Sequence, residues 1–130
     1  MNLTERTYLD PEVNIETKAY WEAAKEGKLL VKVCHSCSRM HYYPRAHCPH
    51  CLSGDTEWTE VSGKGTIYTY SVMRRTDKPY VIAYVTLDEG VTMLTNIVEC
   101  DVDTIDVGDA VEVVFRETEG GFFLPVFRPI

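Results

Sequence analysis

The sequence lacks long apolar runs and any segment typical of an export signal. None of its 130 residues lies in an apolar stretch near the roughly 20 residues that a membrane-spanning helix needs. The N-terminal segment, MNLTERTYLDPE, also lacks the basic region followed by an apolar region that marks a signal peptide. We therefore expect a soluble cytoplasmic protein that does not enter a membrane.

Positive charge is scarce, which argues against partners that are held mainly by cations. The chain has 13 Lys and Arg residues against 20 Asp and Glu residues, so its formal net charge is −7. Nucleic acids and acidic membranes are bound through clustered cations, and we expect neither as a partner. The segment 63–65, Gly-Lys-Gly, lacks the Walker spacing and the following helix of a phosphate loop, so we interpret it as a turn.

A convincing set of catalytic residues is also missing. A nucleophilic cysteine needs a neighbouring base or cation that lowers its pKa. Cys100 ends the β-rich segment LTNIVEC without a basic neighbour, and we interpret it as a buried, inert thiol. The histidines are gathered in one short region of the chain, at His35, His41, His47 and His50.

Four of the five cysteines form two Cys-x-x-Cys pairs, Cys34 with Cys37 and Cys48 with Cys51. Each pair directs two thiolates toward one point, and two pairs together make the tetrahedral four-sulfur site that Zn²⁺ prefers. Four protein ligands leave no position for water or substrate, so we predict a structural zinc. Iron in the same four-sulfur site stays open. A thioredoxin-like redox pair is disfavoured because the segment has no βαβ pattern, and a histidine ligand is unnecessary.

A short helix is predicted before the first cysteine pair. Early acidic residues favour a helix start with Asp10 or Asn14 as the N-cap, and Gly27 favours an end there. Tyr20 and Trp21 give this helix an apolar face. Because so short a helix is unstable alone, this face must pack on the core or on another chain.

After Trp58 the sequence changes to strand-like segments separated by turns. Five such segments are predicted, at 62–75, 80–90, 91–100, 107–117 and 120–129. Five short antiparallel strands favour a small barrel of the oligonucleotide/oligosaccharide-binding (OB) type. We therefore predict a mainly β protein with an N-terminal arm and helix (1–29), a rubredoxin-like zinc ribbon (30–60) and a five-stranded OB-fold domain (61–130).

This order of parts resembles the DUF35 family. The resemblance rests on AYWEAAKEGKLLVKVC, the two cysteine pairs, EWTEVSGKGTIYTYSV, MLTNIVEC, VGDAVEVVF and LPVFRP, and it extends from about Tyr20 to Pro129. It implies a non-catalytic zinc-binding accessory subunit of a heteromeric thiolase-superfamily acyl-CoA enzyme, in a hetero-oligomer such as a heterotetramer. A β-oxidation-type thiolase that degrades lipids, steroids or aromatic compounds is the favoured partner.

The resemblance also implies that the chain helps to form a site for a CoA thioester. Arginine and lysine side chains pair with phosphate oxygens, so the candidates that face CoA or the partner are Arg39, Arg45, Lys64, Arg74 and Arg75. Solvated loop cations are the alternative for these residues. The alternative functions are an OB-fold module that binds single-stranded nucleic acid, a small iron electron-transfer protein, and a partner of an acyl-CoA hydratase or a lipid-transfer-type aldolase.

Overall fold

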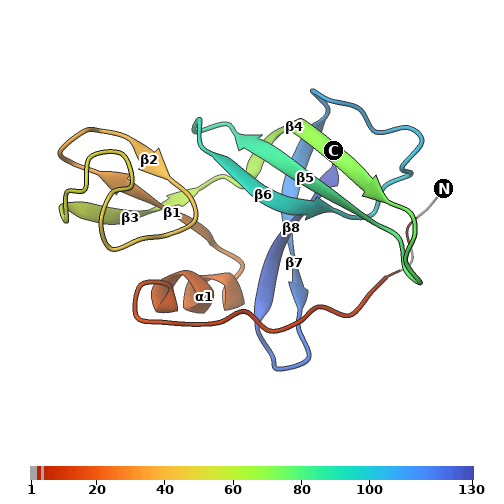
Figure 1. The fold of residues 1–130 in the computed structure, drawn as a ribbon, viewed down its shortest axis with the longest axis horizontal. Helices are drawn as coiled ribbons and strands as arrows, with labels where there is room; N and C mark the ends of the chain where they lie inside the picture. The colour runs from red at the N-terminus through yellow and green to blue at the C-terminus, as the bar shows by residue number, and fades with distance from the viewer. Residues whose placement is uncertain (1–2, 4) are drawn as a thin grey trace.

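The computed structural model describes residues 3 and 5–130, which form a ribbon-like body and a barrel (Figure 1). Residues 1, 2 and 4 of the predicted arm lie outside the described residues. The first body contains α1 (Lys18–Lys25) and a sheet of β1 (Leu29–Cys34), β2 (Met40–His41) and β3 (Thr56–Val61). The barrel contains β4 (Lys64–Met73), β5 (Tyr80–Leu87), β6 (Thr92–Ile97), β7 (Ala110–Glu117) and β8 (Phe123–Pro129). Among the described residues, no helix is long and apolar enough to cross a membrane.

The barrel confirms the predicted fold class. Its strands run in the order β4-β5-β6-β8-β7, and β7 closes the barrel against β4. Within the described barrel, β6 and β8 pair in parallel and the other neighbours pair antiparallel, which is the arrangement of an OB fold. Alternate side chains fill the interior, and Val81, Val85 and Phe127 are fully buried there. The segment 98–109 forms turns rather than a helix.

Helix α1 begins later than the sequence suggested. The predicted N-caps Asp10 and Asn14 are wrong, because Thr17 occupies the N-cap position. The Asn14 side chain accepts a hydrogen bond from the Glu16 N–H at 2.9 Å, so it stabilises a turn that precedes the helix. Gly27 follows the helix with φ of +77°, as predicted for a C-terminal glycine.

The aromatic face of α1 packs within the chain. Tyr20 and Trp21 are 1% and 7% exposed, so they belong to the core. The Tyr20 and Tyr42 hydroxyls are 2.8 Å apart, and Trp21 Nε1 donates to the Tyr43 hydroxyl at 3.1 Å. Burial raises the pKa of Tyr42 to about 12, so this hydroxyl stays neutral. These contacts fix the helix to the loop that separates the two cysteine pairs.

The ribbon and the barrel share one hydrophobic core. A continuous cluster of buried side chains runs from Tyr20 and Val31 in the first body to Ile67 and Phe127 in the barrel. The division of the chain at residues 30 and 60 therefore stays a prediction, although β3 ends at Val61 and β4 begins at Lys64.

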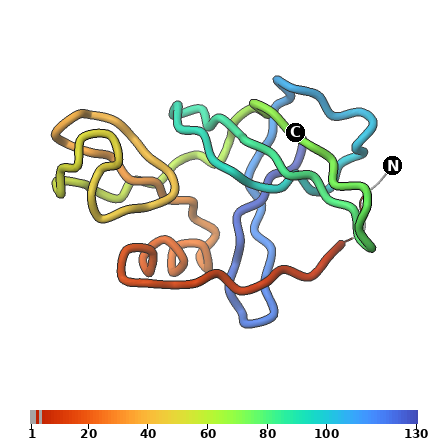
Figure 2. The backbone as a smooth tube through the Cα atoms, in the orientation of Figure 1, coloured from red at the N-terminus to blue at the C-terminus, as the bar shows by residue number. Residues whose placement is uncertain are grey.

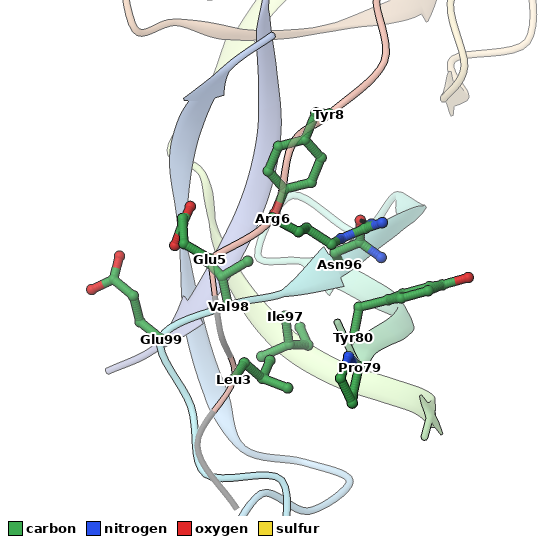
Figure 3. Close-up of a pocket in the computed structure, with 10 residues that line it drawn as sticks. All are labelled: Leu3, Glu5, Arg6, Tyr8, Pro79, Tyr80, Asn96, Ile97, Val98 and Glu99. Atoms are coloured by element: carbon green, nitrogen blue, oxygen red, sulfur yellow. Dashed lines mark hydrogen bonds between the residues drawn. The ribbon is translucent and has the colours of Figure 1, made fainter. Parts of the chain in front are cut away.

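The N-terminal arm crosses the β7–β8 hairpin and runs on toward the β4–β5 loop (Figure 2). The Gly120 N–H donates to the Asp10 carboxylate at 2.9 Å where the arm passes the hairpin. Farther along, the Arg6 guanidinium lies 4.1 Å from the Tyr80 ring centroid and donates to Asn96 Oδ1 at 3.0 Å (Figure 3). The cavity of about 100 Å³ at this point is therefore largely an arm-packing site.

The hydroxyl contact between α1 and the ribbon predicts a measurable stability change. Tyr20→Phe keeps the buried ring but leaves the Tyr42 hydroxyl without its partner. We expect the free energy of unfolding of the zinc-loaded protein to fall by about 1 kcal/mol. Urea unfolding followed by tryptophan fluorescence measures this change. Tyr84→Phe, at an exposed position, is the matched control, and equal stability of the two variants would contradict the assigned contact.

Candidate metal centre

The two cysteine pairs lie in turns with the same hydrogen-bond pattern. Cys34 ends β1, and its carbonyl accepts the Ser38 N–H at 2.9 Å. Likewise, the Cys48 carbonyl accepts the Leu52 N–H at 2.8 Å. Each turn brings the first and the second cysteine of its pair to the same side of the chain. The sheet then sets one turn against the other, because β1 pairs antiparallel with β3 beyond the second turn.

The residue after each pair has a left-handed backbone conformation. Ser38 has φ of 63° and Leu52 has φ of 66°. Glycine adopts this region without steric cost, whereas another residue loses roughly 1–2 kcal/mol there. Zinc ribbons often have glycine at these two positions, and this chain has Ser38 and Leu52 instead. Both residues nevertheless adopt the left-handed conformation, so the two turns keep the same geometry.

The four sulfur atoms converge. All of them lie within 4.8 Å of one another, with Sγ–Sγ distances of 3.6 Å between Cys34 and Cys51 and 3.7 Å between Cys37 and Cys48. Tetrahedral zinc with Zn–S bonds of about 2.3 Å requires Sγ–Sγ distances of about 3.8 Å. The four cysteines are thus positioned for a metal ion of this size.

Electrostatics at the four sulfurs also favour a cation. The backbone amides of Cys37 and Ser36 donate to Cys34 and lower the pKa of its thiol to about 7. At Cys51 the Ser53 amide favours the thiolate, but desolvation and the neighbouring sulfurs outweigh it and raise the pKa to about 12. Four thiolates therefore cannot ionise together at neutral pH unless a metal ion balances their charge.

The histidines of the ribbon lie beside the four-sulfur group, not within it. His35 Nε2 is 2.7 Å from a Glu57 carboxylate oxygen, at the surface. His41 is buried, and its Nε2 accepts the Arg45 N–H at 3.3 Å, while its Nδ1 has no partner among the described residues. Burial lowers the pKa of His41, so this ring is held neutral. Sequence reasoning did not identify this buried position.

The candidate phosphate-binding cations are distributed over three places. Arg39 and Arg45 are exposed on either side of β2. Lys64 begins β4 and Arg74 follows its end, so about 30 Å of strand separates them. Arg75 lies beside Arg74 in the β4–β5 loop. One phosphate group therefore cannot contact Lys64 and Arg74 together. Arg74, Arg75 and Lys78 lie within five residues of the chain, which makes them the densest group of cations.

Cys100 does not have the environment of a nucleophile. Its side chain is 6% exposed, and burial, together with Asp101, raises the pKa of the thiol. In the described part of the chain, no histidine is hydrogen-bonded to it. The interpretation of Cys100 as an inert buried thiol agrees with this environment.

A four-cysteine ribbon joined to a closed five-stranded barrel defines a zinc-ribbon/OB-fold protein. Residues 21–57 match the family described as "ChsH2, rubredoxin-like zinc ribbon domain", and residues 58–116 match "ChsH2, C-terminal OB-fold domain". A "DUF35 domain-containing scaffold protein" of Methanothermobacter thermautotrophicus is 43% identical over 91 residues, covering 65% of this chain and 68% of that protein. The chain belongs to the DUF35 family.

Two further relatives carry names that refer to enzymes. A "probable enoyl-CoA hydratase alpha subunit" of Thermomonospora curvata is 36% identical over 124 residues. The match covers 92% of this chain but 39% of that longer protein. Among solved structures, the "Ltp2-ChsH2(DUF35) aldolase" contains a chain that superimposes with a TM-score of 0.82 at 35% identity, covering 92% of this chain and 98% of that one.

The four-sulfur geometry predicts that each cysteine of the two pairs is needed for metal. Cys34→Ser removes a buried ligand, so we expect bound zinc to fall from roughly one ion per chain to a small fraction of that, with unfolding of the ribbon. Elemental analysis measures the metal, and hydrogen exchange of 29–61 measures the unfolding. Cys100→Ala is the control that retains zinc. Full zinc content in Cys34→Ser would disprove the ligand assignment.

The left-handed residue after the second pair predicts a stabilising substitution. Leu52→Gly relieves the steric cost of the positive φ at an exposed position, and the extra chain entropy of glycine offsets part of this gain. We expect the zinc-loaded variant to gain about 0.5–1 kcal/mol in urea unfolding. Ala46→Gly, an exposed neighbour without a positive φ, should lose about as much. A loss in both variants would show that Leu52 is not strained.

Proposed function

We propose that this chain is a zinc-binding, non-catalytic scaffold subunit of a heteromeric acyl-CoA enzyme. The observation that carries the proposal is its similarity, in sequence and in fold, to almost the whole DUF35 chain of the Ltp2-ChsH2 aldolase. That likeness, at 35% identity, extends over both the ribbon and the barrel. A chain with the same two bodies is suited to the same kind of role, as a subunit beside another protein.

The metal has a structural role in this proposal. Cys34, Cys37, Cys48 and Cys51 would hold one zinc ion, which would crosslink the two turns of the ribbon. The loop between the turns carries Tyr42 and Tyr43, which contact α1. The metal would therefore also keep the helix in place against the barrel.

The catalytic groups would come from the partner. Acyl transfer or carbon–carbon bond cleavage at a thioester needs an activated nucleophile or base in an enclosed site. The described residues contain buried Cys100 and ribbon histidines, and these do not form such a pair. We propose a thiolase-superfamily catalytic subunit as the partner, in a hetero-oligomer such as a heterotetramer. An acyl-CoA hydratase is the second candidate, since a relative that matches this chain over 124 residues is named as a probable enoyl-CoA hydratase alpha subunit.

A CoA thioester would lie at the junction of the two subunits. Its phosphates need cations, and the β4–β5 loop supplies Arg74, Arg75 and Lys78 within five residues. Arg39 and Arg45 could serve the same ligand from the ribbon, or could contact the partner. Lys64, at the far end of β4, would contact the partner rather than these phosphates.

Coexpression with a catalytic subunit tests this function. A thiolase-superfamily subunit and an acyl-CoA hydratase subunit are each coexpressed with this chain in turn. We expect the two chains to elute as one complex by size exclusion with light scattering, and acyl-CoA turnover to require both, because the scaffold completes the CoA site. A catalytic subunit that is soluble, assembled and fully active alone would contradict the proposal. The Cys34→Ser chain, which should lose the ribbon, is the matched negative control.

A further inference from the structure

Three neighbouring strands of the barrel expose a surface with little formal charge. Side chains alternate along β4, β5 and β6, and those that do not enter the barrel point outward. Of the outward positions in these described strands, Lys64 at the start of β4 is charged. The Arg6 guanidinium of the arm also bonds to Asn96 at one edge of the surface. We define the uncharged face as the outward positions beyond Lys64: Thr66, Tyr68, Thr69, Ser71, Met73, Ile82, Tyr84, Thr86, Thr92, Leu94 and Asn96.

The scarcity of charge on this side of the barrel is unexpected for solvent-exposed strands. With 25% charged residues in the whole chain, roughly three of these twelve outward positions, Lys64 included, would carry a charge, whereas Lys64 alone does. Instead the face exposes apolar and aromatic side chains, with Tyr84 at 46%, Leu94 at 48% and Tyr68 at 66% exposure. Loss of charge with enrichment of aromatic residues is typical of the centre of a protein–protein interface.

The uncharged face continues from the barrel to the ribbon body. A shallow groove of about 290 Å³ lies over β4, β5 and β6 and is lined by Ile82, Tyr84 and Leu94. A second groove of about 290 Å³ shares Ile82 and Leu94 and extends to Trp21 and Tyr42. A ligand on this face would therefore contact both bodies, which the shared core holds together.

The two ends of the face differ in charge. The β4–β5 loop at one end carries Arg74, Arg75 and Lys78, with Asp77 in the loop and Asp103 3.7 Å from Arg74. The β5–β6 turn at the other end carries Asp88 and Glu89, and Lys64 lies beside it, since its carbonyl accepts the Asp88 N–H at 2.9 Å. A complementary surface is uncharged and apolar at its centre, acidic opposite the loop and of mixed charge opposite the turn.

This pattern favours a protein over single-stranded nucleic acid. Barrels that bind single strands place cations along the whole binding groove, because every nucleotide brings a phosphate. Here three cations lie at one end, and Lys64 lies with Asp88 and Glu89 at the other, so the centre of the face holds no cation. Tyr68 and Tyr84 could stack bases, but phosphates along the strand would lack counter-charges.

We propose that the uncharged face is the surface on which the catalytic subunit docks. This inference rests on the proposed function and names the surface it uses. The partner's docking region has an apolar, uncharged centre that covers Ile82, Tyr84 and Leu94, and carboxylates that face the β4–β5 loop.

Charge insertion at the centre of the face tests the proposal. Leu94→Glu and Ile82→Glu place a carboxylate at exposed positions that the fold tolerates, and each should weaken binding of the coexpressed thiolase-superfamily subunit by ~30-fold or more. Val107→Glu is the matched control, because Val107 is 58% exposed on the turn between β6 and β7 and lies outside the face. It should bind like the wild-type chain. Circular dichroism and zinc content establish that each variant is folded.

The outcomes separate the docking surface from the function. If the wild-type chain binds the catalytic subunit and folded Leu94→Glu binds equally well, the docking surface is wrong and the proposed function stands. If the wild-type chain does not bind, the proposed function fails. Two further results would overturn the assigned occupant: dimerisation of the chain alone that Leu94→Glu abolishes in sedimentation, or binding of a dT oligonucleotide that the same variant abolishes.

Discussion

The convergence of four cysteine sulfurs is the constraint on which the rest of the first body depends. The segment between the two pairs contains little aliphatic side chain, so its residues cannot bury enough apolar surface to order themselves. Four sulfurs at tetrahedral spacing concentrate negative charge that only a cation relieves. Once the turns are held, Tyr42 and Tyr43 occupy fixed positions, and α1 gains a surface on which Tyr20 and Trp21 can pack.

This order of dependence connects the metal site to the barrel. α1 is too short to be stable alone, and its buried face belongs to the same core as Ile67 and Phe127. The N-terminal arm adds contacts to the barrel at the start of β5 and the end of β6, where Arg6 packs on Tyr80 and bonds to Asn96. The two bodies are thus coupled through apolar packing and hydrogen bonds, and a surface that spans both can act as a single one.

The parts that could be predicted from sequence are those determined by local spacing. The cysteine pairs, the alternation of the five strands and Gly27 at the helix end each depend on residues a few positions apart. The N-cap was mispredicted because Asn14 can stabilise either a turn or a helix start, and the packing of the chain decides between them. The contact between Arg6 and Asn96 joins residues 90 positions apart, and no local pattern indicates it.

The sequence shows that three strand segments lack charge, but it does not show that these segments form an exposed face. TIYTYSVM, VIAYVTL and TMLTNI all lack charge, which also suits strands that are buried on both sides. Only the closed barrel shows that one side of each strand faces solvent. Exposing Ile82, Tyr84 and Leu94 costs free energy in the isolated chain, and contact with an apolar partner recovers it. Copies of a chain with net charge −7 repel one another. The exposed apolar face can therefore remain available for a different protein without causing general aggregation.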